Sequence, residues 1–152
     1  MDIMQHIKFT LTEGLKGSLR RIASKVYEKV GTLSAEFSPS DEPVPFNERM
    51  NLNYSKIQNG QIWHKKSFGC AWFHFTGKVP ECAKGRDVEL VLQLTGEGCL
   101  MDFAGNPLKG LSSINSFIDF VQPVRGKRIL DFKKNADGGE EVDIWVETGT
   151  NR

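Results

Sequence analysis

The residue types that could bind a metal gather in one segment of the chain. Four potential ligands lie within nineteen residues of one another there: His64, Cys70, His74 and Cys82. Imidazole plus thiolate is the ligand set that zinc prefers, but the segment contains no Cys-x2-Cys pair. On a strand, Cys70 and His74 would share a face yet lie about 13 Å apart, because each residue adds about 3.3 Å. We therefore predict no metal site, and single buried or partly buried side chains at these positions.

Paired carboxylates are the second chemistry to consider, because glycosidases use two of them. The candidates are Asp87, Glu89, Glu97 and Asp102. Glu89 alternates out of the core face of its predicted strand, and nothing in the pattern distinguishes these acids from ordinary surface charge. No serine or threonine lies in a nucleophile elbow, and no glycine-rich loop matches a phosphate-binding one. We predict no catalytic residue in this chain.

Tryptophan suggests a third chemistry, stacking on sugar rings, because its apolar face and polar edge suit a sugar. The chain has three tryptophans: Trp63, Trp72 and Trp145. Tryptophans on the strands of a small β-domain are mostly core, so we expect Trp72 and Trp145 to be buried. Trp63 precedes a polar turn, and its role is the most open. If the chain binds a sugar, the predicted contact residues are Trp63, His64, Lys65 and Asn106.

One helix is predicted near the N-terminus. Apolar residues form an amphipathic stripe at Leu15, Leu19, Ile22, Val26 and Val30. Gly31 then supplies a C-terminal stop. Basic residues lie off the stripe, at Arg20, Arg21, Lys25 and Lys29. We expect a helical arm over residues 1–34 that packs on its own domain with its basic face in solvent; docking of a partner protein is the alternative.

Strand signals fill the rest of the chain. Serine and proline dominate residues 33–46, so residues 35–60 are interpreted as a linker and lead-in segment. The predicted strands are Ile62–Trp63, Trp72–Val79, Asp87–Leu94, Gly98–Phe103, Leu108–Leu111, Phe117–Val121, Ile129–Phe132 and Glu141–Glu147. Turns separate them at residues 104–107 and 137–139. Strands spaced by turns, with no intervening helix, predict an antiparallel β-sandwich over residues 61–152.

Composition places the chain among ordinary globular domains. It has 152 residues, a formal net charge of +1, 39% hydrophobic and 26% charged residues. So small a charge gives no general reason to expect nucleic acid or acidic lipid as a partner, and any charged site must be local. No leader or membrane-spanning run is evident, and three scattered cysteines argue against disulfides. We expect a cytoplasmic protein with neither nucleic acid nor membrane as partner.

A series of short motifs runs from Pro43 to Asn151. The first are Pro43-Val44-Pro45-Phe46, Tyr54, Ile57, Gly60-Gln61-Ile62-Trp63, Ala71-Trp72-Phe73-His74-Phe75 and Val79-Pro80-Glu81. The later ones are Gly85-Arg86-Asp87-Val88-Glu89-Leu90, Gly96-Glu97-Gly98, Gly105-Asn106-Pro107-Leu108-Lys109-Gly110-Leu111, Val146-Glu147 and Asn151. In order and spacing, these motifs resemble the N-terminal region of the α-mannosidases of glycoside hydrolase family 38.

The resemblance implies a fold and a role. The fold would be a mainly β, jelly-roll-like, galactose-binding-like sandwich preceded by the helix, as the N-terminal fragment of a longer enzyme. Such enzymes hydrolyse α-linked mannose with retention, using an Asp nucleophile and a zinc ion in a separate catalytic domain. No catalytic or metal-binding residue is carried over to this chain, so no cofactor is expected in it.

The implied role is non-catalytic. The domain would pack on the catalytic domain of the same polypeptide and contribute contacts within a homo-oligomer of the enzyme. An independent carbohydrate-binding module is the alternative.

Overall fold

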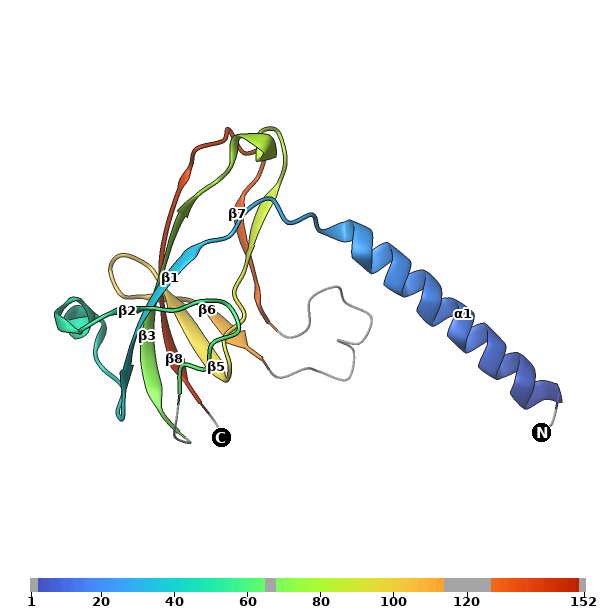
Figure 1. Ribbon diagram of the computed structural model, residues 1–152, viewed down its shortest axis with the longest axis horizontal. Coiled ribbons are helices and arrows are strands. Elements are labelled where there is room, and N and C mark those ends of the chain that lie inside the picture. The colour runs from blue at the N-terminus through green and yellow to red at the C-terminus, as the bar shows by residue number, and fades with distance from the viewer. Residues whose placement is uncertain (1–2, 65–67, 114–126, 151–152) are drawn as a thin grey trace.

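The computed structural model describes residues 3–64, 68–113 and 127–150, as a long helix and a β-domain (Figure 1). Helix α1 spans Ile3–Val26. The strands are β1 (Ser34–Ser40), β2 (Ser55–Lys56), β3 (Cys70–Lys78), β4 (Val88–Val91), β5 (Glu97–Met101), β6 (Pro107–Ser112), β7 (Ile129–Lys133) and β8 (Glu141–Gly149). Two short 3-10 helices complete the set, η1 (Phe46–Asn51) and η2 (Glu81–Ala83). No helix among the described residues is long and apolar enough to span a membrane.

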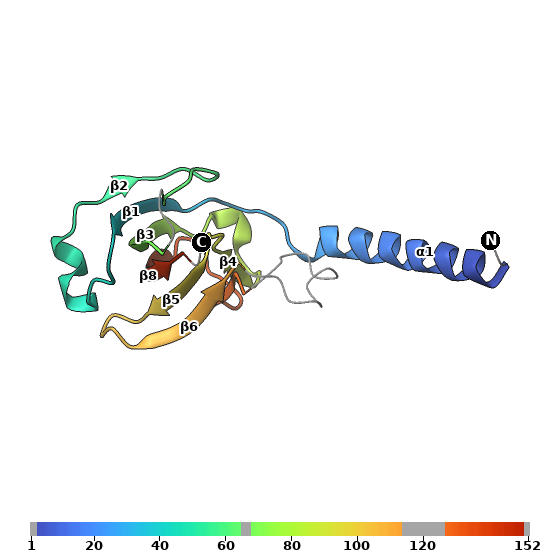
Figure 2. The same cartoon turned by 90° about the horizontal axis from the view of Figure 1, so that it is seen from below.

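The strands form two antiparallel sheets. The larger has six strands in the order β2-β1-β3-β8-β5-β6, and the smaller pairs β4 with β7. Figure 2 shows β4 beside the larger sheet, and the main hydrophobic cluster takes residues from both sheets. Phe73 and Val146 from the large sheet meet Leu90 and Leu130 from the small one in that cluster. The predicted antiparallel sandwich is confirmed.

Alternation along the strands explains how the core is filled. In β3, Phe73 and Phe75 face the core, where their rings stack with centroids 5.8 Å apart. The neighbouring strand β8 pairs with β3 in the same sheet, and its Val146 is completely buried. The predicted hairpin at 98–111 is also present, as β5 paired with β6. These segments were readable because a strand buried on one face shows a period of two in its apolar residues.

The interpretation of residues 35–60 as a linker was wrong for its first part. Residues 34–40 form β1, which pairs with β3 along its whole length, from Ser34 opposite Thr76 to Ser40 opposite Cys70. Pro39 is tolerated there because β2 flanks β1 only at Glu36 and Phe37, so the missing N–H costs no ladder bond on that side. Two other strand predictions differ in outcome: Ile62–Trp63 is not a strand, and Phe117–Val121 lies outside the described residues.

Helix α1 lies within the predicted arm but ends earlier than predicted, and it does not pack on the β-domain. It ends at Val26, not at Gly31, because the following residues run along the domain. Val30 packs beside a second, smaller cluster of Val79, Ala83, Val88 and Ala136. Figure 1 shows α1 pointing away from the sheets. Its predicted core-facing residues Leu15 and Ile22 are 66% and 62% exposed, which overturns the expected packing.

The buried position of Val146 gives a direct test of the core. Val146→Ala removes about two methylene equivalents from a fully buried site. We therefore expect it to lower the free energy of unfolding by about 2 to 3 kcal/mol. Val91→Ala is the matched control: Val91 is 42% exposed on β4, and its truncation should change stability by less than about 0.5 kcal/mol. Urea denaturation of both variants measures the difference. Equal losses of stability in the two variants would contradict the described core.

Candidate functional site

Trp63 is part of the hydrophobic core. Its side chain is 7% exposed and belongs to the main cluster. The indole meets the Phe73 ring edge-on, with centroids 5.5 Å apart. The indole is therefore a core side chain, and stacking of Trp63 on a sugar stays a prediction. The polar turn after it suggested exposure, but the apolar contact with β3 holds the indole inside.

Of the other predicted sugar contacts, His64 lies beside Trp63, whereas Asn106 is part of a distant turn. His64 is half-buried and its ring lies 5.1 Å from the Trp63 ring, whereas Lys65 lies outside the described residues. Asn106 occupies the turn between β5 and β6, where its side-chain amide donates to Asp102 at 2.9 Å. That bond, with backbone N–H groups, holds the pKa of Asp102 below its usual value. Asn106 and Asp102 therefore hold the hairpin turn together.

The turn that carries Asn106 lies on the outer side of the large sheet. A Cβ added at Gly105 would fall 2.6 Å from the Phe46 ring, so this turn packs tightly against η1. The Phe46 ring in turn meets Trp72 edge-on at 5.9 Å. Trp72 alternates with Phe73 along β3 and therefore faces away from the core that holds Trp63. The predicted sugar residues are thus divided between opposite faces of one sheet.

A second layer covers the outer face of the large sheet. The Trp72 indole N–H donates to the Val44 carbonyl at 2.8 Å, and Trp72 is only 1% exposed. Neighbouring Trp145 is 8% exposed and stacks on His74 with ring centroids 4.0 Å apart. Both tryptophans are buried as predicted. The covering segment, residues 43–54, falls in the stretch interpreted as a linker.

Arg49 on η1 holds this second layer to the sheet. Its guanidinium lies 3.5 Å from the centre of the Phe46 ring and 4.8 Å from the centre of the Trp145 ring. Cation–π contacts of this kind are stronger when shielded from water. The Tyr54 hydroxyl donates to the Arg49 carbonyl at 2.9 Å, and the Tyr54 ring meets Trp145 edge-on. Sequence reasoning missed this cluster, although Phe46 and Tyr54 both belong to the motifs that carried the family resemblance.

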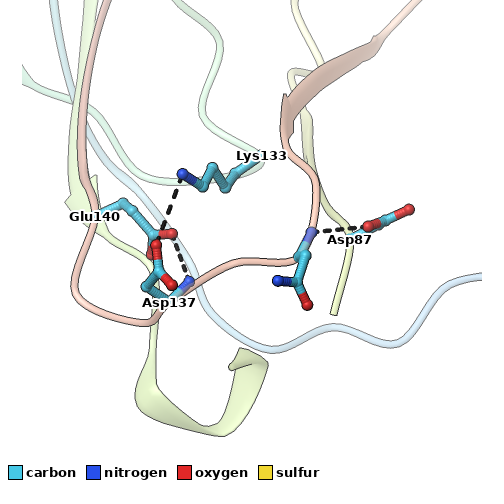
Figure 3. Close-up of polar contacts among 5 residues, drawn as sticks. Asp87, Lys133, Asp137 and Glu140 are labelled. Carbon is cyan, nitrogen blue, oxygen red and sulfur yellow. Dashed lines mark hydrogen bonds and ion pairs between the residues drawn. The ribbon is translucent and has the colours of Figure 1, made fainter. Parts of the chain in front are cut away.

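Carboxylates near the β7–β8 turn make structural contacts (Figure 3). Asp87 accepts the Asn135 backbone N–H at 2.9 Å, and Lys133 lies 3.7 Å from Asp137. Glu140 accepts the Asp137 N–H at 2.7 Å, and backbone N–H groups keep the pKa of Glu140 below its usual value. An acid catalyst needs a raised pKa, so Glu140 is unsuited to that role. The geometry indicates a fixed turn.

Glu147 is the carboxyl group with a raised pKa, and its cause is burial. It lies on the outer face of β8, directly opposite Cys99 on β5. Burial also raises the pKa of Cys99 and of Cys70, with the Glu147 charge as a further contribution, so both thiols resist ionisation. Cys70 and Cys99 lie on strands that β8 separates by about 9.5 Å, and they are two residues out of register, so they are too far apart for a disulfide.

No group of three or more His, Cys, Asp or Glu among the described residues is placed to hold a metal ion.

The connection after α1 borders a cavity of about 270 Å³. Glu28 bonds Arg86 at 2.7 Å across it, and burial together with a hydrogen bond to Glu89 raises the pKa of Tyr27. Ligand pockets are commonly about 300 to 1,000 Å³, so this cavity is small for one. The contacts of Tyr27 and Glu28 attach the connection to the domain just beyond the point where the helix ends.

Exposed apolar side chains mark one end of the β-domain. Phe103 and Leu108, on the β5–β6 hairpin, are 80% and 62% exposed. Met50 on η1 is 66% exposed, and η1 contacts the same hairpin through Phe46 and Gly105. We call Met50, Phe103 and Leu108 the hairpin-end surface. Exposed apolar side chains at these positions suit a contact with another protein surface.

Comparison with known families identifies one match. The family described as alpha-mannosidase, jelly roll domain, matches residues 29–152. The match confirms the resemblance found in the sequence, and it includes β1 and the covering segment as well as the later strands. Helix α1 lies before it. No curated protein matches the chain.

Trp63→Ala distinguishes a core residue from a sugar platform. Loss of a buried aromatic side chain should lower the free energy of unfolding by about 3 to 5 kcal/mol. Leu108→Ala, at an exposed position, should change it by less than about 0.5 kcal/mol. Thermal denaturation monitored by circular dichroism measures both. If Trp63→Ala left stability unchanged and lost affinity for a mannoside, Trp63 would be a sugar contact and not a core residue.

Glu147 makes stability depend on pH in a defined direction. Because burial raises its pKa above the usual 4.5, the folded protein binds this proton more tightly than the unfolded chain does. Its contribution therefore favours folding at low pH and is lost as pH rises through the folded pKa. Glu147→Gln should remove that part of the pH dependence and raise stability at pH 7 relative to the parent. Urea titrations at several pH values test this; a parallel pH profile would contradict it.

Proposed function

We propose, because the chain belongs to the family of α-mannosidase jelly roll domains, that it serves such an enzyme as a non-catalytic domain. The family match over residues 29–152 carries this proposal. Hydrolysis of α-linked mannose would take place in a catalytic domain of the same polypeptide, with zinc bound there. Two observations support a non-catalytic domain. Asp87, Asp137 and Glu140 make the contacts of a fixed turn. Asp102 holds the β5–β6 hairpin turn together.

The domain would support the enzyme by packing against the catalytic domain through the hairpin-end surface. Met50, Phe103 and Leu108 expose apolar groups at one end of the sandwich. Arg49 and Asp102 hold the two elements that carry them, η1 and the hairpin turn, in fixed conformations. Rigid apolar groups bind well because little conformational entropy is lost on contact. Contacts between subunits of a cytoplasmic homo-oligomer are a further part of this proposal.

The test uses the full-length enzyme that contains this domain. Phe103→Asp together with Leu108→Asp should weaken docking by about 2 kcal/mol or more, the range of central interface residues. The enzyme should then lose α-mannosidase activity at a lower temperature than the parent. Lys84→Asp with Lys134→Asp changes two exposed positions elsewhere on the domain and should leave the inactivation temperature near that of the parent.

Two results would overturn the proposal. One is hydrolysis of an aryl α-mannoside by the purified 152-residue chain alone, because the domain would then be catalytic. The other is an inactivation temperature that is unchanged by the Phe103 and Leu108 substitutions, because the hairpin-end surface would then not be a docking surface.

A further inference from the structure

Helix α1 exposes an apolar stripe between Leu11 and Val26. The described apolar residues are Leu11, Leu15, Leu19, Ile22 and Val26, and between 39% and 66% of each is exposed. At about 100° per residue, these five lie within a sector of about 80° on one side of the helix. An isolated helix gains most of its stability by burying such a face. The stripe therefore requires an occupant that the β-domain does not provide (Figure 1).

Basic side chains border this stripe on both sides. Taking the middle of the stripe as zero, Lys16 and Arg20 lie at about +100° and +140°, and Lys25 and Arg21 at about −80° and −120°. The single acid between residues 11 and 26 is Glu13, which lies at about 160°, on the side opposite the stripe. Lys16 and Lys25 therefore border the stripe, one on each side. Arg20, Arg21 and the acid Glu13 lie farther round, on the half of the helix away from it.

We propose that α1 binds flat on an anionic phospholipid surface, with the stripe turned toward the acyl chains. Lysine and arginine can extend their alkyl stems along apolar material while their charges reach the headgroups, so a cationic margin on each side suits this placement. The local charge is what matters here, because the net charge of the whole chain is only +1. The proposal goes beyond the supporting role in an α-mannosidase and does not depend on it.

Charge argues against a second copy of α1 as the occupant. Two such helices packed stripe to stripe would bring cationic margins together on both sides of the contact, and like charges at those positions oppose pairing. The one acid of the described stripe region, Glu13, bonds Lys16 at 2.9 Å and lies away from the contact. An anionic surface would instead attract the two cations that border the stripe, Lys16 and Lys25.

The connection between helix and domain permits this placement. Glu28 and Val30 fix the connection to the domain, through Arg86 and the smaller hydrophobic cluster. The helix itself ends before them, at Val26. At 1.5 Å per residue, the stripe from Leu11 to Val26 gives about 24 Å of surface contact. The sandwich would then be held beside the lipid surface by its N-terminal connection.

The experiment is flotation of the purified 152-residue chain with phosphatidylcholine vesicles, with or without about one third phosphatidylserine. The chain should float with the phosphatidylserine vesicles and much less with pure phosphatidylcholine. Arg21→Gln with Lys25→Gln should weaken binding by about 10- to 30-fold, because each cation contributes about fivefold near an anionic surface. Leu15→Gln with Ile22→Gln should weaken it by about 100-fold. Glutamine keeps helix propensity in both variants.

The matched control is Lys78→Gln with Lys84→Gln, which removes two exposed cations from the β-domain and should leave binding within about twofold of the parent. Equal loss in this control and in the Arg21 and Lys25 variant would overturn the proposal, because binding would then follow net charge alone. Failure of the parent chain to float would overturn it as well. So would a dimer in sedimentation without lipid that Leu15→Gln with Ile22→Gln converts to a monomer, because the stripe would then bind a second copy.

Discussion

The structure depends on the burial of β3 on both of its faces. Along this strand, Phe73 and Phe75 enter the core between the sheets, while Trp72 and His74 face the other way. A sheet face that carries two large aromatic groups cannot be left in water, so a second layer must cover it. The segment from Val44 to Tyr54 meets that need, and Arg49 fastens it by stacking between Phe46 and Trp145. The sandwich therefore has an additional outer layer on its larger sheet.

The same constraint explains which parts of the fold could be read from the sequence. Strands with one buried face, such as β8, show their alternation directly, and the β5–β6 hairpin is marked by its turn. Strand β1 was hidden because serine and proline dominate it, and its place in the sheet comes from pairing with β3. Composition alone could not distinguish this tertiary pairing from a linker. The helix was recognised from its stripe, but its end was set by contacts of Val30 that no local pattern reveals.

The candidate site was harder to predict than the fold. Sequence reasoning correctly buried Trp72 and Trp145, yet it left the role of Trp63 open, although the ring packs against Phe73. A polar turn next to an aromatic residue says nothing about the direction of the side chain. The family was easier to predict from the sequence. Motif residues such as Phe46 and Tyr54 could be recognised before their role in the outer layer was known. Local motifs thus identified the family before the contacts that make them necessary were known.

The projection of α1 also affects how the molecule moves in solution. A helix of 24 residues extends about 36 Å, as far as the diameter of about 34 Å of a compact domain of 100 residues whose radius of gyration is about 13 Å. With the helix held out from the sandwich, friction is greater than for a sphere of 17.1 kDa. Rotation about the long axis becomes faster than end-over-end tumbling. The molecule is therefore hydrodynamically anisotropic although it is a single small chain. Amide N–H bonds that point along the long axis, as in a helix parallel to it, reorient more slowly than bonds that point across it.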